Sequence, residues 1–480
     1  MKPLSGLDAA FLHLETPETP MHVGSLHLYQ VPGRGRAGYF ERARRHIGAR
    51  LHLVPVFTRR LASAPFDVAS PVWVEDREVD LDRHVRRIRL RKPGTMAQLE
   101  AEVARLHGEL LDRGRPLWMF YVIEGLATGE VAWYSKIHHA TLDGSAGVQL
   151  AAALLDVSAT PRKVAKPARR ALEESPGAAA VLGAAIAKSA GEFGKLLRAL
   201  PEVARVAGSG VDAIAALGAA AGERGKGGKD GRRGKSGGTG LPIGPATALN
   251  GPIGRERAFA TASIPLAQAK AIAKRHGAKL NDVVLALVSG ALRRYLASHG
   301  GLPRKPLVAA MPVSLRAQGD SVYSTRVTMV LANLATHLAD PLARLEAIRT
   351  SAGHAKALTV AARSIIPMDF PSLGAPWVIA AIARAYGYAQ GVRAFPPLAN
   401  VIVSNVAGPP APLYLAGARM LSWWPVSIVE HGLGLNVTVQ SYAGSLDFGI
   451  VAAKNAVPDV RKLADALYDA HEELKSLRGR

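Results

Sequence analysis

Two adjacent histidines followed by a carboxylate are the residues best suited to chemistry, in the stretch His138-His139-Ala140-Thr141-Leu142-Asp143-Gly144. The preceding segment, Val131–Ile137, is rich in aromatic and β-branched residues and predicts a strand. Because neighbouring side chains of a strand point to opposite faces, His139 is expected to face away from His138. Two imidazoles arranged in this way do not readily converge on one metal ion. One of them can enter a cleft while the other braces it.

The turn after the histidines is expected to fix their geometry. Asp143-Gly144 predicts a corner between the strand and a helix over Gly147–Leu155. A general base needs an imidazole within reach of a hydroxyl and a pKa near the working pH, and His139 suits that role. The simpler interpretation is that both histidines only satisfy backbone groups at the end of a strand. A metal site is not expected, because no H-E-x-x-H pattern or other ligand cluster is present.

Composition limits the classes of protein to which the chain can belong. Its 480 residues are too many for one ordinary domain, and the apolar fraction of 48% permits a large core. The absence of cysteine excludes disulfides, thiolate metal sites and cysteine nucleophiles. The formal charge of +22 fits either a protein with many exposed arginines or one that meets anionic membranes or phosphorylated substrates. Nucleic acid is less favoured as a partner, because aromatic residues make up only 6% and no nucleic-acid-binding motif appears.

The chain divides into two similar regions around a basic connector. Residues 1–160, which carry the histidines, and residues 251–480 alternate strand-like and helix-like segments, which favours an α/β or α+β fold. Within the connector, residues 161–250, the segment Val181–Leu200 predicts an amphipathic helix with lysines beside its apolar face. The Gly/Lys/Arg-rich stretch Arg224–Gly238 has too little apolar surface to fold, so we expect it to be disordered.

Several motifs together resemble those of the bacterial wax ester synthase/acyl-CoA:diacylglycerol acyltransferases. His138–Gly144 matches the HHxxxDG motif, which that family shares with chloramphenicol acetyltransferase, peptide-synthetase condensation domains and polyketide-associated acyltransferases. The more specific matches follow the family's order over nearly the whole chain, except about residues 161–245. They are Pro3-Leu-Ser-Gly-Leu-Asp8, Pro20-Met-His-Val-Gly24, Pro116-Leu117-Trp118, Asn281-Asp282, Met311-Pro-Val-Ser-Leu-Arg316, Asn400-Val-Ile-Val-Ser-Asn-Val-Ala-Gly-Pro409 and Leu446-Asp-Phe-Gly449.

The resemblance implies two chloramphenicol-acetyltransferase-like domains, each a mixed sheet flanked by helices, with a tunnel between them. Acyl-CoA would enter as co-substrate from one side, and diacylglycerol or a long-chain alcohol from the other. At the meeting point His139 would take the proton of the acceptor hydroxyl, and His138 would support it. The reaction implied needs no covalent acyl-enzyme, no permanently bound cofactor and no metal.

The remaining motif residues are given supporting roles in this scheme. Asp143, with Gly144, is expected to hold the turn by pairing with an arginine, for which Arg316 is the candidate. Ser404 and Asn405 are candidate donors to the developing oxyanion. A further set is expected to shape the tunnel and the domain contact, with packing and helix capping as the simpler alternative. This set comprises Pro116, Leu117, Trp118, Asn281 and Asp282.

The expected location is cytoplasmic, on the inner face of the cell membrane or on lipid inclusions. The first ten residues lack the apolar core of a signal peptide, and no run reaches the roughly 18 to 20 apolar residues of a spanning helix. The basic connector is suited to lie at an anionic interface. Two alternatives stay open: acyl transfer in the same superfamily with another acceptor or a carrier-bound donor, and a non-catalytic protein of lipid surfaces. The sequence does not rank diacylglycerol against fatty alcohol, and it leaves acyl chain length and oligomeric state open.

Overall fold

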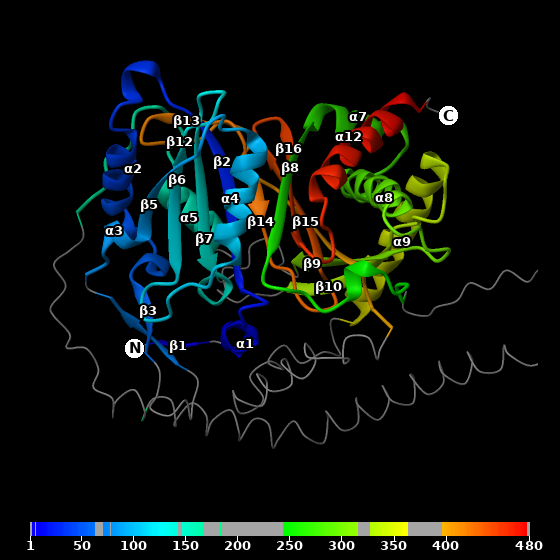
Figure 1. The fold of residues 1–480 in the computed structure, drawn as a ribbon. Coiled ribbons are helices and arrows are strands. Elements are labelled where there is room, and N and C mark those ends of the chain that lie inside the picture. Colours follow the sequence, from blue (N-terminus) through cyan, green and yellow to red (C-terminus); the bar gives the residue numbers. More distant parts are fainter. Residues whose placement is uncertain are drawn as a thin grey trace, which may run out of the picture.

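The computed structural model describes residues 2–4, 6–62, 71–76, 78–142, 146–166, 183, 243–314, 327–362 and 396–477. Two mixed β-sheets lie beside each other, and helices flank each of them (Figure 1). This arrangement confirms the predicted fold of two mixed sheets with flanking helices. The predicted connector elements, Val181–Leu200 apart from Gly183 and Arg224–Gly238, lie outside the described residues.

Strands from both regions of the chain build the first sheet. Its order is β12-β13-β2-β7-β6-β5, and β14 also pairs with β2. All of its pairs are antiparallel except that of β5 with β6. Residues 414–426 therefore extend a sheet whose other strands come from the first 160 residues. The strands are β2 (His22–Gln30), β5 (Val85–Arg89), β6 (Trp118–Glu124), β7 (Val131–His138), β12 (Tyr414–Leu415), β13 (Ala418–Met420) and β14 (Trp424–Val426).

The central strands β6 and β7 carry buried residues on both faces, so both faces of the first sheet are covered. On one face Tyr29, Phe120 and Trp133 pack with helix α2 (Tyr39–Gly48). On the other face Leu26 and Tyr134 pack with α4 (Met96–Gly108), which also contacts β8 (Arg257–Pro265) of the second sheet. Helix α4 therefore lies where the two halves meet. The other helices of this half are α1 (Gly6–Leu14), α3 (Leu81–His84) and α5 (Ala146–Leu154).

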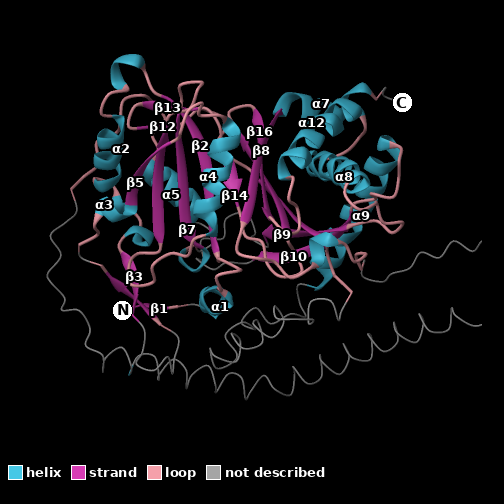
Figure 2. Cartoon of the chain, in the orientation of Figure 1, coloured by secondary structure: helices cyan, strands magenta, loops and turns pink. Residues whose placement is uncertain are grey.

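The second sheet has the order β10-β9-β11-β15-β16-β8. Strand β11 runs parallel to both β9 and β15, and the other pairs are antiparallel. Helices α7, α8 and α12 gather on the side of this sheet that faces away from the first sheet (Figure 2). The strands are β8 (Arg257–Pro265), β9 (Val308–Ser314), β10 (Val327–Asn333), β11 (Val401–Val406), β15 (Leu435–Tyr442) and β16 (Ser445–Ala453), and the helices are α7 (Leu266–Arg275), α8 (Leu280–Ser298), α9 (Pro341–Ala362) and α12 (Val460–Ser476).

Short elements complete the described part of the chain. A three-stranded sheet near the N-terminus has the order β1-β4-β3. Its strands are β1 (Lys2–Pro3), β3 (Arg59–Ala62) and β4 (Val72–Glu75), and the 3-10 helices are Gly33–Gly35, Leu51–Leu53, Pro55–Phe57, His139–Thr141 and Ala248–Asn250. None of the helices described in this chain combines the length and the apolar character that a bilayer crossing requires.

Candidate active site

Strand β7 delivers the histidine pair to the end of the first sheet. The strand ends at His138, and His139 opens the 3-10 helix His139–Thr141. The alternation of side chains between the two faces of the strand therefore does not extend to His139. The backbone N–H of His138 donates to the carbonyl of Leu117 at 2.9 Å, and that of His139 donates to the carbonyl of Met21 at 2.8 Å. The position of His139 is therefore set by the turn and by two neighbouring chain segments.

His138 is fully buried and holds the turn together. Its Nδ1 accepts a hydrogen bond from the backbone N–H of Ala140 at 3.1 Å. Its carbonyl accepts from the hydroxyl of Thr141 at 2.8 Å. Because Nδ1 acts as an acceptor, the proton of the neutral ring is on Nε2. His138 thus contacts the turn that carries His139 through both its ring and its carbonyl, and its role as a brace stays a prediction.

His139 is only partly buried, and its ring stacks on Phe11 of α1 with centroids 3.9 Å apart and planes 23° apart. Burial lowers the pKa of His139 to about 4. The imidazole is consequently neutral at pH 7, and one ring nitrogen carries a free electron pair. The neutral, partly exposed imidazole can accept a proton, but its pKa lies below the range near the working pH that was expected of a general base.

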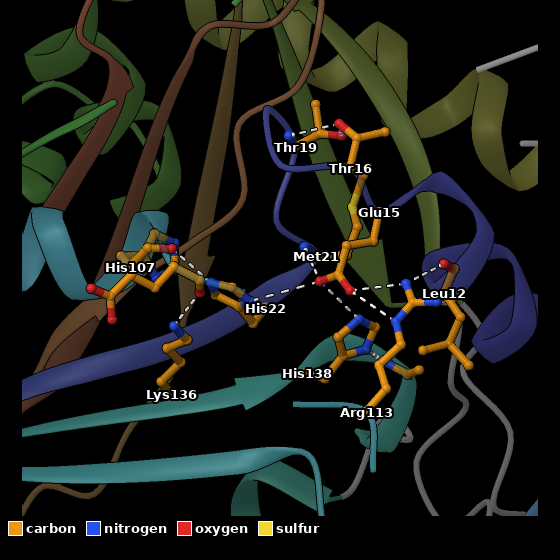
Figure 3. Close-up of polar contacts among 12 residues, drawn as sticks. Leu12, Glu15, Thr16, Thr19, Met21, His22, His107, Arg113, Lys136 and His138 are labelled. Atoms are coloured by element: carbon orange, nitrogen blue, oxygen red, sulfur yellow. Dashed lines mark hydrogen bonds and ion pairs between the residues drawn. The ribbon is translucent and has the colours of Figure 1, made fainter. Parts of the chain in front are cut away.

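Glu15, just after α1, is a site residue that the sequence analysis missed (Figure 3). Its Oε1 lies 3.2 Å from Nε2 of His138 and accepts from the backbone N–H of Met21 at 3.1 Å. Its Oε2 accepts from Nη2 of Arg113 at 2.9 Å. Burial opposes ionisation of Glu15, but His138 and Arg113 outweigh it and hold the pKa of the carboxyl below its ordinary value. The sequence signal was weak: an acidic residue after the apolar helix, between two of the matched motifs.

A second buried polar group links this region to the other half of the molecule. His22 donates from Nε2 to the carbonyl of His107 at 2.6 Å, and its Nδ1 lies 3.9 Å from Oε1 of Glu15. His107 in turn donates from Nε2 to the carbonyl of Ser427 at 2.9 Å. Lys136 is buried beside them and donates to the carbonyl of Leu106 at 2.7 Å, and burial lowers the pKa of its ammonium to about 8.

Residues 116–118 act on the site through the backbone of His138. The carbonyl of Leu117 is the acceptor for the His138 N–H, as described above. Trp118 is fully buried in the core of the first sheet, where its indole donates to the carbonyl of Phe57 at 3.2 Å and its ring stacks on His84. Pro116 is buried as well. Residues 116–118 were expected to shape a tunnel or, more simply, to pack. The contacts described are those of packing in the core and of one backbone hydrogen bond to His138.

The second half brings two of its predicted residues together. The amide of Asn405, on β11, donates to Oδ1 of Asn281 in the first turn of α8 at 3.5 Å. Asp282 is buried and accepts from the backbone N–H of Lys279 at 2.8 Å, which closes the N-terminus of α8. Helix α8 begins at Leu280, so Asn281 and Asp282 lie inside its first turn.

Ser404 is half-buried on β11. Three predicted residues, Asp143, Gly144 and Arg316, lie outside the described residues. Within the described ranges, no group of three or more histidine, aspartate or glutamate side chains is arranged to hold a metal ion.

Comparison with known proteins decides the family. The family model described as the wax ester synthase/diacylglycerol acyltransferase catalytic domain matches residues 4–284, and the model of the C-terminal domain of the same proteins matches residues 324–475. The chain belongs to this family. The predicted resemblance is thereby confirmed, and the protein is an acyltransferase of the wax ester synthase/diacylglycerol acyltransferase type.

Relatives match this acyltransferase from end to end. A Mycobacterium tuberculosis protein named as a diacylglycerol O-acyltransferase is 37% identical over 483 residues, covering 99% of this chain and 100% of its own. The O-acyltransferase WSD of Acinetobacter baylyi is 34% identical over 492 residues, covering 100% of this chain and 97% of its own.

Solved structures agree with the fold. The wax ester synthase/diacylglycerol acyltransferase from Marinobacter aquaeolei VT8 superposes with a TM-score of 0.70 at 27% identity, covering 99% of this chain and 98% of its own. The first condensation domain of the calcium-dependent antibiotic synthetase superposes with a TM-score of 0.51 at 14% identity, covering 100% of this chain and 97% of its own. This likeness concerns the fold alone.

Proposed function

We propose that this acyltransferase moves a fatty acyl group from acyl-CoA to the hydroxyl of a lipid alcohol, with His139 as the general base. The observation that carries the proposal is the state of His139: neutral, partly exposed and stacked on Phe11, beside a His138 that is wholly enclosed. The names of the relatives favour diacylglycerol and long-chain alcohols as acceptors. Their products would be triacylglycerol and wax ester.

The proposed reaction is one direct transfer. The free nitrogen of His139 takes the hydroxyl proton while the acceptor oxygen bonds to the thioester carbonyl carbon. The tetrahedral intermediate then collapses, the carbon–sulfur bond breaks, and the CoA thiolate receives the proton from His139. The ester is formed, CoA leaves as the thiol, and the imidazole returns to its neutral state. No acyl-enzyme is formed, in keeping with the absence of cysteine from the chain.

Other residues take supporting roles in this proposal. Asn405 and Ser404 are candidate donors to the oxyanion of the intermediate. Asp143 is proposed to hold the turn, with Arg316 as its partner. We also propose division of the chain at residues 1–160, 161–250 and 251–480, with the tunnel for both substrates between the outer two regions.

The positive charge of the protein is suited to binding an anionic lipid surface that holds the acceptor. The formal charge is +22, and the connector contributes the basic run Arg224–Lys235. We propose that this acyltransferase binds peripherally to the cell membrane or to lipid inclusions, where its acceptor resides.

The decisive experiment replaces His139 with alanine. Transfer of labelled palmitoyl from palmitoyl-CoA is measured with diacylglycerol and with hexadecanol as acceptors. We expect a loss of about 10²–10⁴-fold, the usual contribution of a general base. His52→Ala, at an exposed histidine of the same half, is the matched control and should leave the rate unchanged. If His139→Ala transfers palmitoyl at the wild-type rate, the assignment of the base is wrong.

A further inference from the structure

We infer that Glu15 is a positioning residue of the active site and that Arg113 holds it in place. Glu15 would act through His138 and Met21 on the turn that carries His139, without touching a substrate. This inference rests on the proposed role of His139 as the base. It adds to that role a buried carboxylate supplied by the chain segment that follows α1.

The two oxygens of Glu15 have separate tasks. Oε1 faces inward, 3.2 Å from Nε2 of His138, and accepts from the N–H of Met21 at 3.1 Å. Oε2 faces Arg113, which donates from Nη2 at 2.9 Å and from Nε at 3.3 Å. The same Nη2 donates to the carbonyl of Leu12 at 2.6 Å, so Arg113 also ties the carboxylate to the end of α1 (Figure 3). The Glu15 side chain itself is only 2% exposed.

Two short routes connect Glu15 with His139. One passes through the ring of His138, whose Nε2 faces the carboxylate and whose Nδ1 accepts from the N–H of Ala140 in the turn. The other passes through the peptide of Met21, whose N–H donates to Glu15 and whose carbonyl accepts from the N–H of His139 at 2.8 Å. The carboxylate therefore acts on both sides of the turn, and it favours the His138 tautomer that the turn needs.

An amide cannot reproduce this arrangement. In Glu15→Gln, an amide oxygen placed toward Met21 and His138 leaves the NH₂ group against the guanidinium of Arg113. The opposite orientation places the NH₂ group against two N–H donors. Either orientation loses one of the two sets of contacts, although the volume of the side chain is kept. The expected result is a turn that holds His139 less accurately.

The test measures palmitoyl transfer by Glu15→Gln, by His139→Ala and by the double variant. We expect Glu15→Gln to lower kcat about 10²-fold, the cost of misplacing a reacting group by about 1 Å, with the KM for palmitoyl-CoA changed less than about threefold. In the His139→Ala background the same substitution should cost nothing further, because the group that it positions is gone. A merely structural defect would multiply with the loss caused by His139→Ala.

A second variant keeps the inference testable if Glu15→Gln does not fold. The Arg113 side chain is 46% exposed, so Arg113→Ala removes its contact with little disturbance of the core, and it should lower kcat in the same non-additive way. Arg115→Ala, which removes a surface arginine paired with Asp112, is the control. The inference is overturned if His139→Ala is inactive while Glu15→Gln and Arg113→Ala keep the wild-type kcat, or if their losses multiply with that of His139→Ala. An active His139→Ala enzyme would instead overturn the proposed base.

Discussion

Glu100 on α4 joins the two halves of the acyltransferase and permits a sharp test of their contact. Its buried Oε1 accepts from the N–H of Thr261 at 2.8 Å, from the hydroxyl of Thr261 at 2.7 Å and from Nη1 of Arg461 at 3.0 Å. Thr261 lies on β8, the edge strand of the second sheet. An edge strand presents N–H groups that its own sheet does not satisfy, and Glu100 satisfies this one from the other half.

The expected loss of stability follows from the two hydrogen-bond donors of Thr261, its N–H and its hydroxyl, which Glu100→Ala would leave without an acceptor. Thr261 is 6% exposed, and an unsatisfied buried donor costs about 1–3 kcal/mol, so we expect a loss of about 3 kcal/mol once water partly fills the space. With an unfolding entropy of about 2.1 cal/mol/K per residue, 480 residues give about 1 kcal/mol/K, and the loss lowers Tm by about 3 °C.

Thermal unfolding followed by circular dichroism measures this effect. Glu102→Ala is the matched control: Glu102 lies on the same helix and forms an i,i+3 pair with Arg105 at the surface, which contributes at most about 1 kcal/mol. We expect the control to shift Tm by less than about 1 °C. Equal shifts for Glu100→Ala and Glu102→Ala would refute the reasoning, because they would show that Thr261 does not depend on the carboxylate.

Two further predictions concern acid and membranes. Burial lowers the pKa of His27 to about 4 and that of His107 to about 3, whereas both titrate near 6.5 when unfolded. Below about pH 6.5 the unfolded chain therefore binds protons that the folded chain does not, so the folded state loses stability as the pH falls. The midpoint of urea unfolding should decrease steadily from about pH 7 to 4.5. A constant midpoint would contradict burial of these rings in the neutral form. Deletion of residues 176–240 removes the basic run and should weaken binding to vesicles with 30% anionic lipid by roughly 1 kcal/mol for each basic residue lost from the surface. Unchanged sedimentation with vesicles would show that this segment does not bind the membrane.

The parts of the site that the sequence predicted are those encoded over a few residues. The strand before the histidines was visible because its side chains have a local pattern, and β7 extends only one residue further, to His138. The helix expected over Gly147–Leu155 corresponds to α5, Ala146–Leu154, whereas the corner expected at Asp143-Gly144 lies outside the described residues. The sequence could not show that β7 ends before His139, because the turn depends on contacts with Leu117 and Met21 from other segments.

The parts that were missed depend on contacts between distant positions. Glu15 and Arg113 are 98 residues apart in the chain, and no spacing rule relates them. Glu100 and Thr261 are 161 residues apart. Likewise, β12, β13 and β14 return from the second region to extend the first sheet, and short strands of two or three residues carry no periodic signal. Fold class could be predicted from the order of elements, but the supports of the site could not.

The structure also gives a physical reason for two adjacent histidines where one base is enough. The inner position must accept from the N–H of Ala140 on one side and face the carboxylate of Glu15 on the other, while it is fully buried. A neutral imidazole offers an acceptor and a donor on opposite sides of one rigid ring, which suits His138 to that place. Once the inner ring fixes the turn, the outer ring is free to keep one nitrogen for a substrate. In the proposed mechanism His138 transmits the position of Glu15 to the turn, and His139 acts as the base.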